Sequence, residues 1–513
     1  MSAATLLTSH FATLPDILRE HALEQGSKIA VADAGGAYTY AELDALMDRV
    51  AAGLQRDGVR QGQSVAIIAA ASINYAAIFF GVLRAGCVVT PLTPSATPQT
   101  LAAMIADCGA PIVFVDRDSD TALADEPIAA QRVECDGDAF FEWLAPGDTR
   151  PIPVRILPED GFNIIYSSGT TGTPKGIVQS HQMRWSHIGR NSAGGYAQAV
   201  TLTSTPLYSN TTLVSFLPTI GWGGTAVLMK KFDPRGFLDL AQKHRATHAM
   251  LVPVQYQRLM AVPEFERYDL SSFALKTSTS APFSAALKAD VLARWPGRLL
   301  EFYGMTEGGA STCLDCTEFP DKLHTVGQPL AGHQIRLIDD EGKEVPKGAV
   351  GEIVGRSPAM MTAYHGRGSA TAEAEWHDRE GNRYIRHGDI GRFDEDGFLI
   401  LMDRKKDLII SGGFNIYPID LEAVLAQHPA VAECTVIGVP SETWGETPIG
   451  FYVPHTGVGQ SAEQILAWTN ARLGRTQRLT SLRLIDELPR SAIGKVLKRE
   501  LRAAVAAEVP YRH

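Results

Sequence analysis

Residues 166–176 constrain this chain most, because they place many hydroxyls, three glycines and one lysine between two apolar runs. Glycines let backbone N–H groups turn toward an anion, and Lys175 adds a point charge. The apolar residues 162–166 and 177–178 predict a strand on each side, which favours a strand–loop–strand hairpin over a flexible Ser/Gly linker. The segment therefore predicts a loop that binds polyphosphate.

This loop differs from the common P-loop of nucleotide-binding proteins. A P-loop requires Gly-Lys-Ser/Thr after a four-residue gap, whereas here Pro174 precedes Lys175 and Gly176 follows it. A different ATP chemistry is therefore expected.

Strands and helices alternate on both sides of the loop. Buried strands are predicted at residues 65–68, 87–90, 112–115, 226–229 and 249–252, and helices at residues 14–25, 76–85 and 101–107. Such alternation predicts parallel α/β layers. A Pro-rich connector at residues 146–158 interrupts it. Beyond residue 327, short strands between Gly, Pro and Asp turns predict a small β-barrel-like unit.

The length of 513 residues exceeds what one hydrophobic core supports, so at least two domains are expected. A charged segment at residues 403–407 lies between two apolar runs. We predict a large N-terminal domain at residues 1–402, a hinge at residues 403–406 and a small, mobile α+β lid domain at residues 407–513.

The charge balance argues against several partners. Lys and Arg total 47 against 57 Asp and Glu, a formal charge of −10, so neither nucleic acid nor an anionic membrane is expected as a partner. No segment is apolar and long enough to span a bilayer, and residues 1–24 lack a secretory pattern, which predicts a cytoplasmic location. A homodimer is one of the oligomeric states that the sequence leaves open.

The six cysteines are scattered, which predicts free thiols. Cys313 and Cys316 form a C-x-x-C pair, but no second pair completes a zinc site and no thioredoxin-like context surrounds them.

The phosphate loop resembles the signature of the adenylate-forming superfamily, which contains acyl-CoA and aryl-CoA ligases such as 4-coumarate–CoA ligase, stand-alone adenylation domains and firefly luciferase. Further family motifs follow in order along nearly the whole chain: Tyr-Gly-Met-Thr-Glu at 303–307, His-Gly-Asp at 387–389, Asp-Arg-Lys-Lys-Asp at 403–407 and Pro-Arg-Ser-Ala-Ile-Gly-Lys at 489–495. The resemblance implies activation of a carboxylic acid with ATP, Mg²⁺ and CoA.

The resemblance also implies a role for each matching residue. Lys495, Thr306 and Glu307 are the implied catalytic residues, with Glu307 holding Mg²⁺ and Thr306 contacting the α-phosphate. Lys495 would bridge the carboxylate and the α-phosphate. The implied ATP- and AMP-binding residues are Ser167, Ser168, Gly169, Thr170, Thr171, Gly172, Lys175, Ser280, Ala281, Pro282, Tyr303 (against adenine), Gly304, Thr306, Asp389 and Arg404 (at the ribose) and Lys495.

The hinge motif implies a second reaction in the same site. Lys406 occupies the pivot position of the family, about which the small domain would rotate to exchange Lys495 for an incoming thiol. After rotation, Ser411, Gly412, Gly413 and Phe414 would line the path of CoA, because glycines let the backbone approach a slim pantetheine arm.

The acyl pocket indicates the class of acid. By resemblance it contains Tyr208, Ser209, Thr212, Thr279, Gly308 and Ala310. Residues 206–212 contain no acidic side chain to pair with an amino acid's ammonium and no basic one to pair with a second carboxylate. Ser209, Thr279 and Ser280 depart from the usual family residues, which favours a medium-sized or aryl monocarboxylate, including a hydroxylated one.

Other functions remain open at this stage. A stand-alone adenylation enzyme would use the same first reaction and then load a carrier-protein thiol. A luciferase-like oxygenase needs chemistry that nothing in the sequence demands. A non-catalytic nucleotide-binding homologue would have lost motif residues such as Glu307, Asp389 or Lys495, and all three are present.

Overall fold

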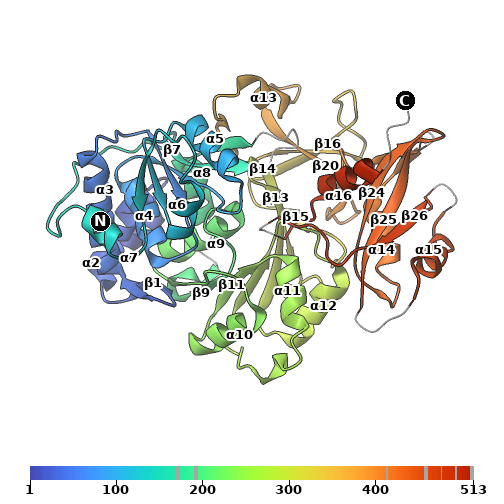
Figure 1. Cartoon of the computed structure of the whole chain (residues 1–513), viewed down its shortest axis with the longest axis horizontal. Coiled ribbons are helices and arrows are strands. Elements are labelled where there is room, and N and C mark those ends of the chain that lie inside the picture. The colour runs from blue at the N-terminus through green and yellow to red at the C-terminus, as the bar shows by residue number, and fades with distance from the viewer. Residues whose placement is uncertain are drawn as a thin grey trace. The chain divides into compact units, whose positions relative to one another are not determined.

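A computed structural model describes residues 1–167, 174–189, 194–411, 414–455, 460–474, 477–491 and 494–508, without the side chains of Asn415 and Glu508. The chain divides into two units (Figure 1). Unit 1 comprises Met1–Gln334 and Gly355–Ile385, and unit 2 comprises Ile335–Val354 and Arg386–His513. The predicted hinge at residues 403–406 stays a prediction.

One sheet of unit 1 holds the nucleotide motif at 303–307. Its strands are β1 (Ile29–Asp33), β2 (Gly36–Thr39), β9 (Val200–Thr203), β10 (Thr225–Leu228), β11 (His248–Leu251), β12 (Leu275–Ser278), β13 (Arg298–Met305), β14 (Gly308–Asp315) and β15 (Gln328–Pro329). They run in the order β15-β14-β13-β12-β11-β9-β10-β1-β2. The pairs from β13 to β1 are parallel, and the outer strands β2, β14 and β15 pair antiparallel.

A second sheet of unit 1 holds the phosphate-loop segment. Its strands are β3 (Ser64–Ile68), β4 (Val88–Pro91), β5 (Ile112–Val115), β6 (Gln131–Glu134), β7 (Gly161–Ser167), β8 (Lys175–Ser180) and β18 (Ala363–Tyr364). They run in the order β18-β8-β7-β4-β3-β5-β6, parallel from β7 to β6. The predicted parallel α/β layers are therefore confirmed.

Helices cover both sheets (Figure 1). Those of unit 1 are α1 (Ala3–Leu7), α2 (Leu14–Gln25), α3 (Tyr40–Arg56), α4 (Ile73–Arg84), α5 (Pro98–Cys108), α6 (Arg117–Ala122), α7 (Gly137–Trp143), α8 (His181–Gly189), α9 (Asn210–Gly221), α10 (Pro234–Lys243), α11 (Pro253–Met260), α12 (Ala285–Arg294) and α13 (Gly368–Glu373), with the short 3₁₀ turns η2 (Tyr196–Gln198) and η3 (Phe265–Arg267). The core lies where α2, α3 and α4 pack together against apolar side chains of β1, β3 and β4.

Helix ends follow the local sequence. Thr39 and Glu42 form a capping box that starts α3, since each side chain bonds to the backbone of the other. Thr97 caps α5, Pro98 fills its first position, and the helix ends at Gly109. These signals place the helices that support the two sheets.

Unit 2 is an α+β unit. Its elements are β16 (Gln334–Ile338) and β17 (Gly351–Arg356), whose outermost residues belong to unit 1, β20 (Arg383–Phe393), β21 (Leu399–Arg404), β22 (Ile409–Ser411), β23 (Phe414–Ile416), α14 (Pro418–Leu425), β24 (Val431–Ser441), β25 (Gly445–Pro454), α15 (Ala462–Asn470), β26 (Ser481–Leu484) and α16 (Lys498–Glu508). The first residues of β20 pair with β19 (Glu375–His377) in unit 1, and its later residues pair with β21 in unit 2.

The sheet of unit 2 after residue 407 runs β23-β22-β25-β24, with β26 parallel to β25. Leu421 and Leu425 of α14 and Ile465 of α15 share one apolar cluster with this sheet. Leu501 and Val505 of α16 belong to another. The predicted α+β composition of this part is confirmed.

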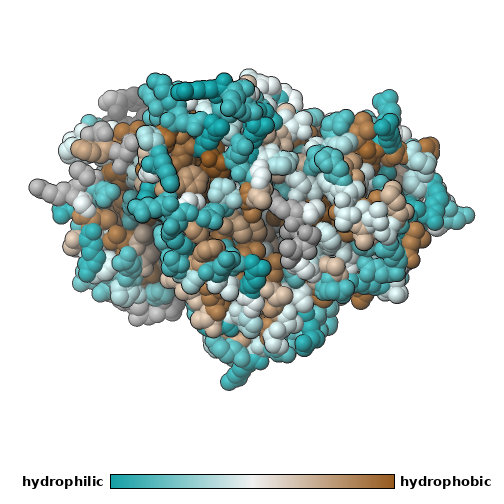
Figure 2. Space-filling view, turned by 180° about the vertical axis from the view of Figure 1, so that it is seen from behind, coloured by the Kyte–Doolittle hydropathy of each residue, from teal (hydrophilic) through white to brown (hydrophobic). Residues whose placement is uncertain are grey.

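In the part of the chain that the structure describes, no helix combines the length and apolar character needed to cross a bilayer. The six cysteines are free thiols, as predicted, and burial raises the pKa of Cys87 to about 12. Figure 2 shows one face, where hydrophilic side chains surround smaller apolar areas.

Candidate active site

The phosphate-loop segment joins two antiparallel strands. Ser167 at the end of β7 pairs with Lys175 at the start of β8, which confirms the predicted hairpin. The predicted phosphate ligands between these strands, Ser168, Gly169, Thr170, Thr171 and Gly172, lie outside the described residues. The described ends of the hairpin therefore fix where the loop begins and ends.

Lys175 and Glu307 meet at one tyrosine. The Lys175 ammonium lies 5.2 Å from the centre of the Tyr364 ring, within the range of a cation–π interaction. The Tyr364 hydroxyl donates a hydrogen bond of 2.8 Å to Glu307 Oε1. Burial, followed by the charge of Glu307, raises the pKa of Tyr364, so the phenol stays a donor. Tyr364 thus links the phosphate loop to the predicted metal-binding carboxylate.

Thr306 and Glu307 form the turn between β13 and β14, where Met305 pairs with Gly308. Gly308 has φ +87°, and a Cβ there would lie 1.7 Å from the Ala359 carbonyl oxygen. Gly308 was predicted to leave room in the acyl pocket. In the structure it also allows the segment around Ala359 to lie against the turn that carries Glu307.

A buried polar network holds the backbone of Thr306. Gln179 on β8 donates to the Thr306 carbonyl at 2.7 Å and accepts from Asn163 of β7 at 2.9 Å. Arg184 of α8 is fully buried and donates to both amides, at 2.8 Å to Asn163. Burial lowers the pKa of Arg184 to about 9. The Asn163 and Gln179 amides carry no charge, so hydrogen bonds rather than ion pairs hold this buried network together. The network therefore fixes the geometry of the turn.

Residues 361–367 brace both motifs, although none of the sequence motifs contains them. The Met361 N–H donates to the Glu307 carbonyl at 2.7 Å, and the His365 N–H donates to the Gly176 carbonyl at 2.7 Å. Arg367 forms an ion pair of 3.0 Å with Asp107 of α5. This segment therefore fixes the start of β8 and the Glu307 turn relative to each other.

The predicted acyl-pocket residues from 208 to 212 have defined local roles. Ser209 is buried and caps α9 through the Thr211 N–H at 3.3 Å. The Thr212 hydroxyl donates to the Pro206 carbonyl at 2.6 Å. Tyr208 is half-buried, and burial raises its pKa while the hydroxyls of Thr93 and Ser95 oppose that rise.

Thr211, which the sequence analysis did not single out, connects α9 to the loop after β12. Its hydroxyl lies 2.5 Å from the Ser280 hydroxyl. Ser280 has φ +81°, an unfavourable conformation for a residue with a side chain. Thr279 and Ala281 beside it are half-buried, whereas Pro282 is exposed. This strained loop thus presents hydroxyl groups where the family resemblance places both substrates.

The remaining predicted residues of unit 1 lie on β13 and β14. Tyr303 and Ala310 are buried, and Gly304 is half-buried. A Cβ at Gly304 would lie 2.7 Å from the Ser311 hydroxyl, so the glycine allows close packing of the two strands.

In unit 2, the predicted ribose residues face each other across two strands. Asp389 of β20 is in register with Arg404 of β21, and their side chains are 3.5 Å apart. The neighbouring Lys405 binds Glu352 at 3.0 Å and Asp340 at 2.9 Å. Lys405 therefore anchors β21 while Arg404 stays beside Asp389.

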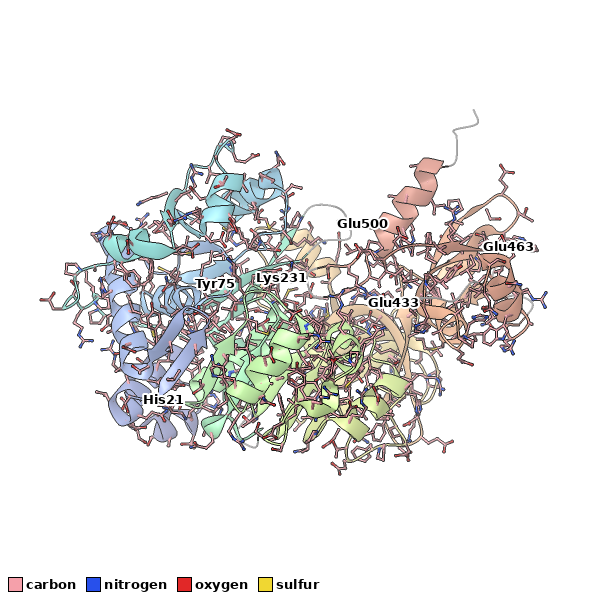
Figure 3. All side chains as sticks on the ribbon, turned by 60° about the horizontal axis from the view of Figure 1, so that its bottom comes forward. His21, Tyr75, Lys231, Glu433, Glu463 and Glu500 are labelled. Atoms are coloured by element: carbon pink, nitrogen blue, oxygen red, sulfur yellow. The ribbon has the colours of Figure 1, made fainter. Side chains whose placement is uncertain are left out.

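Lys495 ends a tight loop within unit 2. Arg490 forms an antiparallel bridge with Val496, and the Ser491 N–H donates to the Lys495 carbonyl at 2.8 Å. Arg490 also donates to the Gly494 carbonyl at 2.7 Å and pairs with Glu433 of β24 at 2.6 Å. Glu433 is labelled in Figure 3. These contacts fix the backbone from which the Lys495 side chain extends.

The charge of Lys495 is tuned by its surroundings. Its pKa is lowered to about 8, first by burial and then by the positive charge of Arg404, whereas Asp389 opposes that change. Lys406 lowers it further and Asp407 raises it. The predicted ribose residues and the predicted catalytic lysine thus act on one another electrostatically within unit 2.

The predicted hinge and the predicted CoA-binding segment each carry an exposed side chain. Lys406 is exposed, and desolvation followed by the Arg404 charge lowers its pKa. Ser411 pairs with Phe414 in a tight antiparallel turn, and the Phe414 side chain is 59% exposed. Gly412 and Gly413 lie outside the described residues.

Glu307 is the carboxylate of unit 1 that could hold Mg²⁺. Among the described residues, no group of three or more His, Cys, Asp or Glu side chains forms a complete metal site. Mg²⁺ is commonly held by one or two carboxylates together with substrate phosphates, so Glu307 beside the phosphate-loop lysine fits that mode. The cations and hydroxyls of unit 1 suit polyphosphate, and the Asp–Arg–Lys group of unit 2 suits a sugar and an anion.

Comparison with known proteins covers nearly the whole chain. The AMP-binding enzyme family model matches residues 18–365, and the AMP-binding enzyme C-terminal domain model matches residues 420–495. Feruloyl-CoA synthase of Amycolatopsis sp is 34% identical, over 92% of this chain and 95% of that protein. The fatty acid–acyl-carrier-protein ligase ScoC of Streptomyces coeruleorubidus is 30% identical, over 96% of each chain. The crystal structure of ATP-bound MatB from Rhodopseudomonas palustris has a TM-score of 0.85 at 29% identity, over 98% of this chain and 99% of that one.

Proposed function

The chain belongs to the AMP-binding enzyme family, and on that premise we propose that it joins a carboxylic acid to CoA through an acyl-AMP intermediate, at the expense of ATP. The predicted family and fold class are confirmed by the family models and by the matching solved structures. The observation that carries the proposal is the linked group of Lys175, Tyr364 and Glu307 in unit 1, because it supplies a cation and a carboxylate beside the predicted phosphate loop.

In the first reaction, an oxygen of the substrate carboxylate attacks the α-phosphorus of ATP. The bond from that phosphorus to the β-phosphate oxygen breaks, and pyrophosphate leaves with the electron pair. Catalysis then requires positioning and charge stabilisation rather than a protein nucleophile. Lys495 neutralises charge between the carboxylate and the α-phosphate, and Thr306 donates its hydroxyl to the same phosphate. Glu307 would hold a magnesium ion, which would supply further neutralisation of phosphate charge.

The remaining predicted residues bind the nucleotide. Lys175 and Ser167 receive the β- and γ-phosphates, Tyr303 lies against adenine, and Asp389 accepts hydrogen bonds from the ribose hydroxyls. The 3.5 Å separation of Asp389 and Arg404 supports this assignment, since the guanidinium orients the carboxylate.

In the second reaction, the CoA thiol releases its proton to solvent and its sulfur attacks the acyl carbonyl carbon. The bond to the AMP oxygen breaks, giving the thioester and AMP. We assign Lys406 as the pivot that exchanges the two arrangements, with the hinge at residues 403–406. Ser411, Gly412, Gly413 and Phe414 would then contact the pantetheine arm, which the exposure of Phe414 supports.

The acid is proposed to be a medium-sized or aryl monocarboxylate that carries a hydroxyl. Among the described side chains, Ser278 Oγ and Asn210 Oδ1 are buried without a hydrogen-bond partner, next in sequence to the segments joined by Thr211 and Ser280. A substrate hydroxyl could satisfy such groups, whereas a charged tail would have no counterion from residues 206–212. The similarity to feruloyl-CoA synthase supports an aryl acid.

Loading of a carrier-protein thiol is the second candidate from the sequence. ScoC is named as a carrier-protein ligase, but the similarity to feruloyl-CoA synthase favours CoA. The cytoplasmic location and the homodimer stay predictions from the sequence.

A panel of acids tests the proposal. Purified protein would be supplied with ATP, Mg²⁺ and either CoA or a pantetheinylated carrier protein, over short, medium and long fatty acids, benzoates and hydroxycinnamates. We expect thioester and AMP with CoA and an aryl acid. Product with the carrier protein alone would establish the second candidate, and exclusive use of long-chain fatty acids would overturn the assignment of the acid.

A further inference from the structure

Tyr364 is the residue on which the phosphate-loop lysine and the metal-binding carboxylate converge. We propose that Tyr364 is a positioning residue that presents Glu307 to Mg²⁺ through its hydroxyl and supports Lys175 through its ring. The inference rests on the proposed function, because it assumes that Glu307 and Lys175 bind the metal–ATP complex. It adds a residue to that site which none of the sequence motifs contains.

The hydroxyl acts on Glu307. A carboxylate has two oxygens, and the 2.8 Å hydrogen bond from Tyr364 occupies Oε1. The second oxygen is then left for a cation, in an orientation that the phenol restricts. Hydrogen bonds to ligating carboxylates are a general means of tuning metal affinity.

The ring acts on Lys175. The ammonium lies 5.2 Å from the ring centre, so the aromatic face offers a half-buried cation a favourable position beside the loop. Lys175 would otherwise lose rotamer freedom when phosphate binds, and a pre-ordered side chain reduces that loss. The ring and the hydroxyl of one residue therefore serve two different ligand groups.

Tyr364 is itself held rigidly. It pairs with Ile177 in β8, the strand that begins at Lys175, and its N–H donates to the Thr371 hydroxyl at 3.0 Å. Three residues earlier, the Met361 N–H donates to the Glu307 carbonyl at 2.7 Å. The same short segment is thus tied to the strand of Lys175 and to the turn of Glu307, so Tyr364 cannot move independently of either.

A packing role is the alternative explanation, because Tyr364 also belongs to an apolar cluster with Ile177, Met361 and Ile385. Two substitutions separate the roles. Tyr364→Phe removes the hydroxyl and keeps the ring, whereas Tyr364→Leu removes both. Tyr384→Phe is the matched control, since it also removes a 2.8 Å tyrosine hydrogen bond in unit 1, to Gln334.

The test is binding of the non-hydrolysable ATP analogue α,β-methylene-ATP, measured by calorimetry with Mg²⁺ and again with EDTA. For Tyr364→Phe we expect affinity for the magnesium complex to fall about 10-fold. Binding in EDTA should stay within about twofold of wild type. Tyr364→Leu should weaken binding under both conditions, and Tyr384→Phe under neither. Adding Tyr364→Phe to Glu307→Gln should cost no further affinity, since the hydroxyl acts through that carboxylate.

Two outcomes would overturn the proposal. An equal loss of binding with and without Mg²⁺ in Tyr364→Phe would make the residue structural only, and unchanged binding in both would remove any role for the hydroxyl. A wild-type protein that binds no nucleotide and exchanges no pyrophosphate with any acid would instead contradict the proposed function, so the two failures are distinguishable.

Discussion

The lowered pKa of Lys495 leads to a pH dependence that the adenylation reaction should show. Only the ammonium form can neutralise charge between the carboxylate and the α-phosphate. With a pKa of about 8, roughly nine in ten Lys495 side chains are protonated at pH 7 and about one in ten at pH 9. Adenylation should therefore weaken as pH rises through 8, the direction opposite to that of a general base.

The assay is acid-dependent exchange of labelled pyrophosphate into ATP between pH 6.5 and 9.5. The kcat/KM for ATP reports the free enzyme and should fall about tenfold per pH unit above the pKa. The two charged neighbours of Lys495 predict pKa shifts of opposite sign, because Arg404 lowers the pKa of Lys495 and Asp389 raises it. Arg404→Gln should move the falling limb up by about one pH unit and Asp389→Asn should move it down, whatever the change in absolute activity.

A kcat/KM that stays flat from pH 7 to 9.5 would refute a requirement for protonated Lys495. It would also be refuted if both substitutions moved the falling limb in the same direction, since the two neighbours carry opposite charges.

Further substitutions test three other features of the protein. Lys495→Ala should abolish pyrophosphate exchange but largely spare thioester formation from supplied acyl-AMP, and equal damage to both reactions would contradict the exchange of two arrangements. Arg490→Ala and Glu433→Gln should each loosen the Lys495 loop and lower pyrophosphate exchange about 10-fold, with thioester formation unaffected. Unchanged exchange would show that the Arg490–Glu433 ion pair does not support Lys495. Gly308→Ala should lower the Tm more than Gly348→Ala. Both glycines have positive φ, but only a Cβ at Gly308 would meet backbone atoms. Equal Tm shifts by calorimetry would show that the contact between Gly308 and Ala359 is unimportant.

The α/β layers were predictable because their signal is local. Strand β3 (Ser64–Ile68) is buried at every position, so its apolar run could be recognised without any partner. The start of the helix at Tyr40 is harder to predict, because Tyr38, Thr39 and Tyr40 are all residue types that favour a strand. The capping box of Thr39 and Glu42 makes Tyr40 the first residue of α3 instead.

The site was predictable where one motif carries the chemistry, as at Thr306 and Glu307. Tyr364 was not predictable, because it lies 57 residues after Glu307 in the chain. It reaches Glu307 only once β18 pairs with β8. Thr211 likewise meets Ser280 across 69 residues. Gly308 was predicted for its small size, but the reason for that size lies in a backbone contact that only the folded chain creates.

Activation of an acid by adenylation can be followed by isotope exchange. Purified protein with ATP, Mg²⁺ and labelled pyrophosphate should incorporate label into ATP only when a suitable acid, such as a hydroxycinnamate, is added. CoA should then release AMP and thioester from the same mixture. If no acid in a broad panel supported exchange by the wild-type protein, the account would be contradicted.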